Sequence, residues 1–199
     1  RAFIVPPGWK MIAADYSQVE LRIAAHLTRD AGLVAAFAAG EDIHRATAAT
    51  VLGIDPDAVT SDQRSFAKRV NFGLLYGMGA RSLADQAGIP LAEAKQFVDA
   101  YFARFRVIAD YIASTKQRAK EQGYVTTLLG RRRAFPILAS TTVDGRTRML
   151  QAAAEREAIN HPIQGTAADI IKIAMIHIHA ALQAQGLQAR MLLQVHDEL

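Results

Sequence analysis

Two acidic residues each follow a short apolar run, near opposite ends of the chain. Asp15 comes directly after residues 10–14, and Asp197 comes two residues after Val195, which ends the apolar run that begins at Met191. We interpret both runs as short strands that pair side by side. Two carboxylates at neighbouring strand ends can hold a pair of hard divalent cations, which activate one oxygen and stabilise another in phosphoryl transfer. The alternative is that each Asp caps a turn, a commoner role for this residue.

A second set of candidate residues recurs at intervals of four. Arg64, Lys68, Phe72 and Tyr76 lie in a stretch that predicts a helix from Ser61 to Tyr76. Each step of four advances about 400°, so the row drifts by only about 40° per step and forms one stripe. Cations followed by aromatic rings suit a nucleoside triphosphate, with phosphates at one end and base and sugar at the other. The alternative is an amphipathic helix whose Arg and Lys stems cover apolar surface.

A third set, Arg156, Asn160 and Gln164, also recurs at intervals of four. Amides and a guanidinium can bridge to minor-groove acceptors, which are similar for all base pairs and so allow binding without sequence preference. Pro162 predicts that a helix over 146–160 ends here and that another begins near 166. Capping of this turn by Asn160 is therefore the alternative role.

The composition limits the class of protein. With 51% hydrophobic and 21% charged residues, the 199-residue chain is typical of globular proteins. The absence of Cys excludes a disulfide framework and a thiolate metal site. No run approaches the roughly 20 apolar residues of a membrane span, so we expect no membrane partner.

The net charge of +4 is unevenly distributed. Between Arg104 and Arg148 there are ten Lys or Arg against three Asp or Glu, and this surplus includes Arg131, Arg132 and Arg133. The surplus indicates either a surface that faces phosphates or a solvated helix face.

The order of elements predicts an α+β fold that is predominantly helical. Strands are expected at 10–14 and 190–195, with the helices already named and others over 90–104, 107–122 and 166–184. This arrangement favours a small antiparallel sheet interrupted by a helical insertion, and strands are too few for a doubly wound α/β fold.

Five segments together resemble a known family. They are ADYSQVELRIAAHL, EDIHRATAATVLG, RSFAKRVNFGLLYGMGA, EREAINHPIQGTAADIIK and QVHDEL, in this order along the chain. The chain resembles the polymerase domain of family A DNA polymerases, the bacterial DNA polymerase I type. The resemblance implies a first palm part at 1–22, helical fingers at 23–154 and a second palm part at 155–199. It also implies that the chain is a piece of that domain, without the thumb, an exonuclease domain or the strand after the last motif.

The resemblance further implies a role for each matching residue. Asp15 and Asp197 would hold two Mg²⁺ ions, for which Mn²⁺ is a possible substitute, with the Tyr16 carbonyl as a further ligand. Glu198 would support this metal site, and Lys68 completes the catalytic set. The dNTP would contact Arg64, Lys68 and His44 through its phosphates. It would contact Phe72 through its sugar and base, and Glu20 would lie where a ribonucleotide has its 2′-oxygen. Tyr76 would lie by the templating base, and the primer-template minor groove would contact Arg156, Asn160, Gln164 and His196.

The implied activity is template-directed addition of a dNTP to a primer 3′-hydroxyl. Its partners would be DNA primer-template and dNTPs, and we expect a monomer in the bacterial cytoplasm. The terminal His-Asp-Glu-Leu is accordingly not interpreted as a retention signal of the endoplasmic reticulum.

Two other functions remain open on the residues alone. One is a metal phosphohydrolase that uses His196 and Asp197 together with His44 and His161. The other is a nucleic-acid-binding module without catalysis, in which the basic region binds and the acidic pair has a structural role.

Overall fold

A computed structural model describes residues 4–142 and 144–199. The fold is mostly helical with one small antiparallel sheet, so the predicted class is confirmed. The predicted segments 1–22 and 23–154 include residues 1–3 and 143, which lie outside the described residues. The predicted boundary between 154 and 155 falls inside a long helix, and the division into segments stays a prediction.

Four of the described helices lie between residues 19 and 75, and a side chain caps the start of three of them. They are α1 (Val19–Thr28), α2 (Ala31–Ala38), α3 (Ile43–Leu52) and α4 (Ser61–Leu75), with a 3-10 turn η1 (Pro56–Ala58) before α4. Asp30 and Asp42 cap α2 and α3 by accepting backbone N–H groups. Thr60 and Gln63 form a capping box at α4, in which each side chain accepts the other residue's backbone N–H. These caps explain why α4 begins at the predicted residue.

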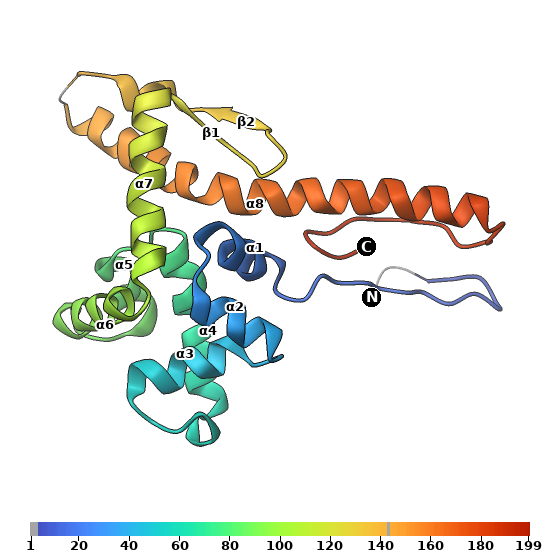
Figure 1. Ribbon diagram of the computed structural model, residues 1–199, viewed down its shortest axis with the longest axis horizontal. Helices are drawn as coiled ribbons and strands as arrows, with labels where there is room; N and C mark the ends of the chain where they lie inside the picture. Colours follow the sequence, from blue (N-terminus) through green and yellow to red (C-terminus); the bar gives the residue numbers. More distant parts are fainter. Residues whose placement is uncertain (1–3, 143) are drawn as a thin grey trace.

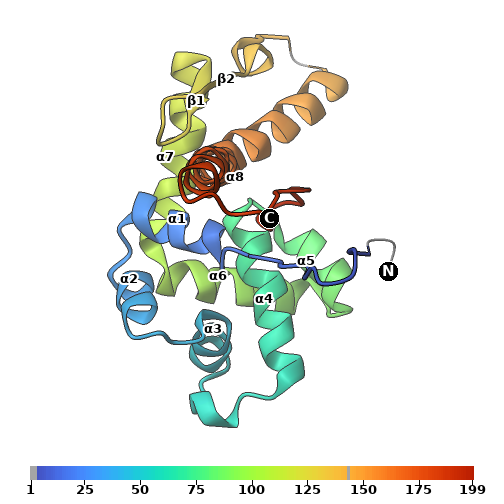
Figure 2. The ribbon, with the colours of Figure 1, turned by 90° about the vertical axis from the view of Figure 1, so that its right-hand side faces the viewer.

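The other described helices and the sheet lie between residues 80 and 184. They are α5 (Ala80–Ala87), α6 (Leu91–Arg104), α7 (Arg106–Gln122), β1 (Tyr124–Thr126), β2 (Arg132–Ala134), η2 (Pro136–Ala139) and α8 (Gly145–Ala184). Helix α8 spans the molecule, α7 crosses its first half, and the β1–β2 hairpin lies beside that same half (Figure 1). Seen along the second half of α8, α1 and α4 lie on the same side of it as the C-terminal segment (Figure 2).

One core joins elements from both halves of the chain. Leu21 and Ile23 of α1 pack with Leu75 of α4 and with Ile159 and Ile163 of α8. A second cluster joins α4 to α5 and α6 through Val70, Leu74, Leu83 and Tyr101. Helix α4 is thus held on two faces, which fixes the direction of the stripe that it carries.

The prediction that Pro162 ends a helix is wrong. Helix α8 continues through this residue from Gly145 to Ala184. Proline removes one backbone donor, but the flanking Ile159 and Ile163 are fully buried in the core. Packing of this turn outweighs the lost hydrogen bond, and the row Arg156, Asn160, Gln164 therefore lies on one continuous helix.

The two predicted strands are also corrected. Residues 10–14 and 190–195 do not form ladder strands, and only isolated bridges join Asp15 to Glu198 and Val195 to Glu198. The sheet is instead the hairpin of β1 and β2, inside the basic region that was expected to belong to the helical segment.

Within the described residues, α8 alone is long and apolar enough to cross a membrane by length and composition. The expectation that no such stretch exists is corrected by this finding. The first half of α8 packs on α1, α7 and β1, and 22% of the apolar stretch is buried. The absence of a membrane partner stays a prediction.

Candidate nucleotide and DNA site

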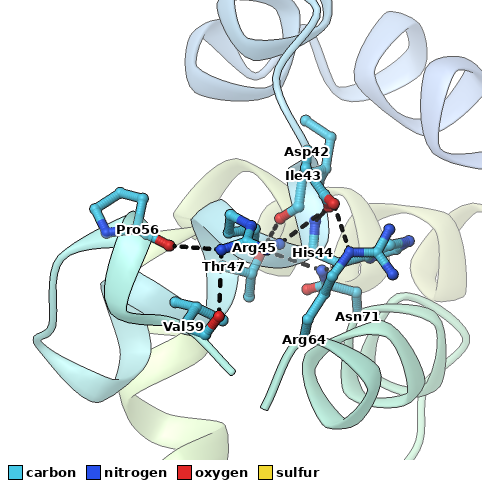
Figure 3. Close-up of polar contacts among 9 residues, drawn as sticks. All are labelled: Asp42, Ile43, His44, Arg45, Thr47, Pro56, Val59, Arg64 and Asn71. Carbon is cyan, nitrogen blue, oxygen red and sulfur yellow. Dashed lines mark hydrogen bonds and ion pairs between the residues drawn. The ribbon is translucent and has the colours of Figure 1, made fainter. Parts of the chain in front are cut away.

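The cationic end of the stripe is organised by an acidic residue at the start of α3. Asp42 Oδ1 accepts the backbone N–H groups of His44 (3.0 Å) and Arg45 (3.1 Å), and Oδ2 accepts Arg64 Nε at 2.5 Å (Figure 3). Burial acts to raise the pKa of Asp42, but the hydrogen bonds from Arg64 and the helix backbone outweigh it and hold the pKa below its ordinary value. Asp42 therefore stays ionised and ties Arg64 to the helix that carries His44.

The pairing with Asp42 also orients the Arg64 guanidinium. Only Nε faces the carboxylate, and the two terminal nitrogens point away from it (Figure 3). Lys68, one turn further along α4, is exposed. The two cations can therefore present N–H groups to an anion while Asp42 holds one of them in place.

His44 lies under this cationic end and is only 2% exposed. Burial lowers the pKa of His44, the charges of Arg64 and Lys68 lower it further, and Asp42 opposes them. Its ring centroid is 5.8 Å from that of Phe72. His44 is therefore neutral near pH 7 and links the cations to the aromatic end of the stripe.

The aromatic end reaches α1 and α8. The rings of Phe72 and Tyr76 stack with centroids 6.2 Å apart, and the Tyr76 hydroxyl donates to the Glu20 carboxylate. Burial and the Glu20 carboxylate raise the pKa of the Tyr76 hydroxyl, and the neighbouring Gln164 opposes this shift. The structure thus brings together three residues that the sequence placed in separate motifs.

The row on α8 lies next to the end of α4. Gly77, with φ +77°, approaches α8 so closely that an added Cβ would lie 3.2 Å from Ile159 Cδ1 and 3.6 Å from Arg156 Cγ. Arg156 and Gln164 are exposed, whereas Asn160 has a buried Oδ1 without a hydrogen-bond partner. The predicted minor-groove residues and the predicted nucleotide stripe therefore border one another.

The acidic residues meet through their backbones. Ala14 and Leu199 exchange two hydrogen bonds of 2.9 Å, Tyr16 N donates to Asp197 O at 3.1 Å, and Asp15 lies opposite Glu198. Residues 14–16 and 197–199 therefore lie side by side, whereas the predicted runs 10–14 and 191–195 do not pair as strands. His196 lies at the bend, with φ 55°, and is exposed.

Carboxylates and a carbonyl are the oxygen ligands that Mg²⁺ prefers, so the donor set of Asp15, Asp197 and the Tyr16 carbonyl fits this ion. Across residues 4–142 and 144–199, His, Asp and Glu side chains form no group of three or more that could hold a metal. The predicted set has two side chains and one carbonyl, so this finding does not test it. A phosphohydrolase site built from His44, His161 and His196 would need such a group, and the described residues give it no support.

The basic surplus is partly neutralised by α8. Arg131 pairs with Asp169 at 2.8 Å, Arg133 with Glu157, and Lys116 and Lys120 with Glu155 at 3.2 and 2.7 Å. Arg131 also donates to Gly165 O at 2.8 Å, which docks the hairpin loop on α8. Four of the ten basic residues are therefore paired with acidic residues of α8, which leaves fewer of them free to face phosphates.

Two residues of the site were missed from the sequence, Asp42 and Asn71. Asp42 precedes the helical run Ile43–Leu52, and that N-cap position could have been recognised. Asn71 carries no such signal, because its role depends on the packing of α4 against α3.

Comparison with known proteins matches the whole chain to one family. The family model described as DNA polymerase family A matches residues 1–199. The DNA polymerase I of Chloroflexus aurantiacus is 52% identical over 199 residues, that of Pseudomonas aeruginosa 51%, and the thermostable DNA polymerase I of Thermus thermophilus 47%. Each comparison covers 100% of this chain but 20%, 21% and 23% of the relative, so the chain spans about a fifth of their length.

A solved structure agrees with these relatives. The POL domain of Pol1 from M. smegmatis, in complex with DNA primer-template and dNTP, superposes with a TM-score of 0.92 at 47% identity. The match covers 99% of this chain and 34% of that chain. Sequence and fold agree over essentially all residues, and the chain belongs to DNA polymerase family A.

Proposed function

We propose that this segment takes part in template-directed DNA synthesis, by nucleotidyl transfer from a dNTP to a primer 3′-hydroxyl. One observation carries the proposal: the TM-score of 0.92 and 47% identity to a polymerase domain whose structure contains DNA primer-template and dNTP. In the reaction the primer 3′-oxygen bonds to the α-phosphorus, the bond from that phosphorus to the bridging oxygen breaks, and pyrophosphate leaves. The hydroxyl proton passes to solvent, and no side chain acts as a nucleophile.

The phosphate end of the dNTP is assigned to Arg64, Lys68 and His44. The Asp42 carboxylate holds Arg64 through Nε, so the terminal N–H groups are already oriented when the nucleotide arrives. Such preorganised donors stabilise charge without reorganising during the reaction. Lys68 adds an exposed charge one turn away.

The sugar and base are assigned to the aromatic end of the stripe. Phe72 would contact the sugar and base, and Tyr76 would lie by the templating base. Because the Tyr76 hydroxyl holds the Glu20 carboxylate, Glu20 is fixed in position and would exclude a ribose 2′-oxygen. Arg156, Asn160, Gln164 and His196 would contact the minor groove of the primer-template.

Asp15, Asp197 and the Tyr16 carbonyl would hold two Mg²⁺ ions, or Mn²⁺ in their place, with Glu198 in support. When bound, such ions activate the attacking oxygen and stabilise the leaving one. The backbone hydrogen bond between Tyr16 and Asp197 keeps these ligands on adjacent segments.

We infer further that the enzyme acts as a monomer in the bacterial cytoplasm, and that the segment belongs to a longer polymerase domain. The experiment is therefore primer extension by a chimera, in which this chain replaces the matching segment of the Chloroflexus aurantiacus DNA polymerase I. Template-dependent extension is expected. A chimera that binds primer-template but does not extend it would favour a binding module without catalysis.

A further inference from the structure

A buried amide on α4 lies between two residues of α3. Asn71 is 3% exposed, and its Nδ2 is 3.0 Å from Thr47 Oγ1 and 3.3 Å from His44 Nδ1 (Figure 3). All three side chains are almost completely buried. In such surroundings each N–H needs an acceptor, because an unpaired buried polar group costs free energy.

The hydroxyl of Thr47 determines which way the amide faces. Thr47 has one hydroxyl hydrogen, which it donates to Ile43 O at 2.8 Å. Its oxygen can therefore only accept a hydrogen bond from Asn71, and the atom of Asn71 that faces it must be the NH₂ nitrogen. The other hydrogen of the same NH₂ group is then available to His44 Nδ1.

This orientation selects one tautomer of the imidazole. A nitrogen that accepts from Asn71 carries no hydrogen, so in neutral His44 the hydrogen lies on Nε2. Burial and the charges of Arg64 and Lys68 keep His44 neutral by lowering its pKa. His44 therefore offers one N–H donor, in the surroundings of the two cations assigned to the phosphates.

We propose that Asn71 is a positioning residue, which fixes His44 as the Nε2–H tautomer so that this nitrogen donates to a phosphate oxygen of the nucleoside triphosphate. The proposal rests on the proposed function of the segment, and it adds a residue that touches no nucleotide. Thr47 takes part by holding the amide in the required orientation.

The first test is a double-mutant cycle in the chimera. Asn71→Leu keeps the shape of the side chain but loses the hydrogen bonds, and His44→Ala removes the donor. Each change is expected to raise the KM for dNTP about tenfold, the worth of a hydrogen bond to a charged group, with little change in kcat. The double variant is expected to show no further rise, because Asn71 acts through His44.

Matched controls separate positioning from stability. Val70→Ala makes a cavity one residue away on α4, in the second cluster, and its effect is expected to add to that of His44→Ala. Thr47→Val removes the hydroxyl and is expected to raise the KM as well, without adding to Asn71→Leu. Additive effects of Asn71→Leu and His44→Ala would overturn the proposal, and leave the proposed function standing if the chimera still extends primers.

The second test reads the tautomer directly and needs no activity. The chain has six histidines, so ¹⁵N-histidine NMR can assign His44 by comparison with the His44→Gln variant. The expected result is a protonated Nε2 and an unprotonated Nδ1 at neutral pH. In the Asn71→Leu variant, a mixture of the two neutral tautomers is expected. A hydrogen on Nδ1 of the unsubstituted chain would refute the proposal. Failure of primer extension with the expected tautomer would instead count against the proposed function.

Discussion

Asp15 lies directly opposite Glu198 in an antiparallel bridge, although the two residues stand near opposite ends of the chain. The bridge is flanked by the paired Ala14 and Leu199 and by the hydrogen bond from Tyr16 to Asp197. Three carboxylates are thus carried by two adjacent segments without a regular sheet. The core that joins α1, α4, α7 and α8 brings the two distant parts of the chain together, so that these segments can meet.

Removal of either predicted metal ligand is expected to abolish synthesis. Asp15→Ala and Asp197→Ala should each lower kcat by at least about 10³-fold, because metal ions supply several kcal/mol of charge stabilisation in phosphoryl transfer. Glu198→Gln should cost less, since its assigned role is support. Single-nucleotide incorporation by the chimera measures all three. The exposed Asp99 on α6 provides the matched control Asp99→Ala, and equal losses in all variants would contradict the assignment.

Truncation of Glu20 is expected to relax the discrimination against ribonucleotides. Glu20→Ala removes the carboxylate that the Tyr76 hydroxyl holds, and the ratio of kcat/KM for dNTP and rNTP should fall at least about tenfold. Tyr76→Phe should lower the same ratio less, because the carboxylate remains but is no longer held. Competition between the two nucleotides in primer extension gives the ratio. An unchanged ratio for Glu20→Ala would remove this residue from its assigned role.

The stability of the fold is expected to fall as pH falls from about 7 toward 5. Burial lowers the pKa of both His44 and His161 in the folded state, so below the ordinary value of 6.5 the unfolded chain binds more protons. Each His can then contribute a slope of at most about 1.4 kcal/mol per pH unit. Asp42 and Glu155, whose pKa values are lowered by their cationic partners despite burial, add a further loss only below about pH 4.5.

Denaturant unfolding at several pH values measures this slope. His161→Gln removes one titrating group and is expected to flatten the dependence between pH 7 and 5. The exposed Gln185 gives a control without a titrating group, since Gln185→Ala should leave the slope as it is. A slope that is the same in both variants and in the unsubstituted chain would contradict the explanation.

A side chain at Gly165 is expected to displace the hairpin loop from α8. An added Cβ would lie 2.6 Å from Thr127 Cγ2 and 3.3 Å from Arg131 Nη2, so Gly165→Ala should cost about 1–3 kcal/mol of unfolding free energy. Gly145 is the matched control, because nothing lies within 4 Å of its Cβ position at the start of α8. Gly145→Ala should be neutral or stabilising by up to about 1 kcal/mol. Equal effects at the two glycines would count against the close contact at Thr127.

The helices were predicted well where local signals define them. Helix α4 begins at Ser61 because of its capping box, and α7 ends at Gln122, where Gly123 adopts the left-handed conformation. Periodicity and caps depend on neighbouring residues, so a single sequence contains them. Pro162 was misjudged because a proline is a local signal, whereas the burial of Ile159 and Ile163 depends on other helices.

Residue types and spacing alone determined much of the candidate site. The stripe Arg64, Lys68, Phe72, Tyr76 follows from the helical period, and the acidic residues follow from their place after apolar runs. Tertiary structure alone decided which stripes meet. It placed Glu20 and Gln164 next to Tyr76. It also paired Asp42 with Arg64 and brought the Asn71 amide within hydrogen-bond distance of His44. The reason is physical: these contacts join residues far apart in sequence, and only packing of a shared core brings such residues within hydrogen-bond distance.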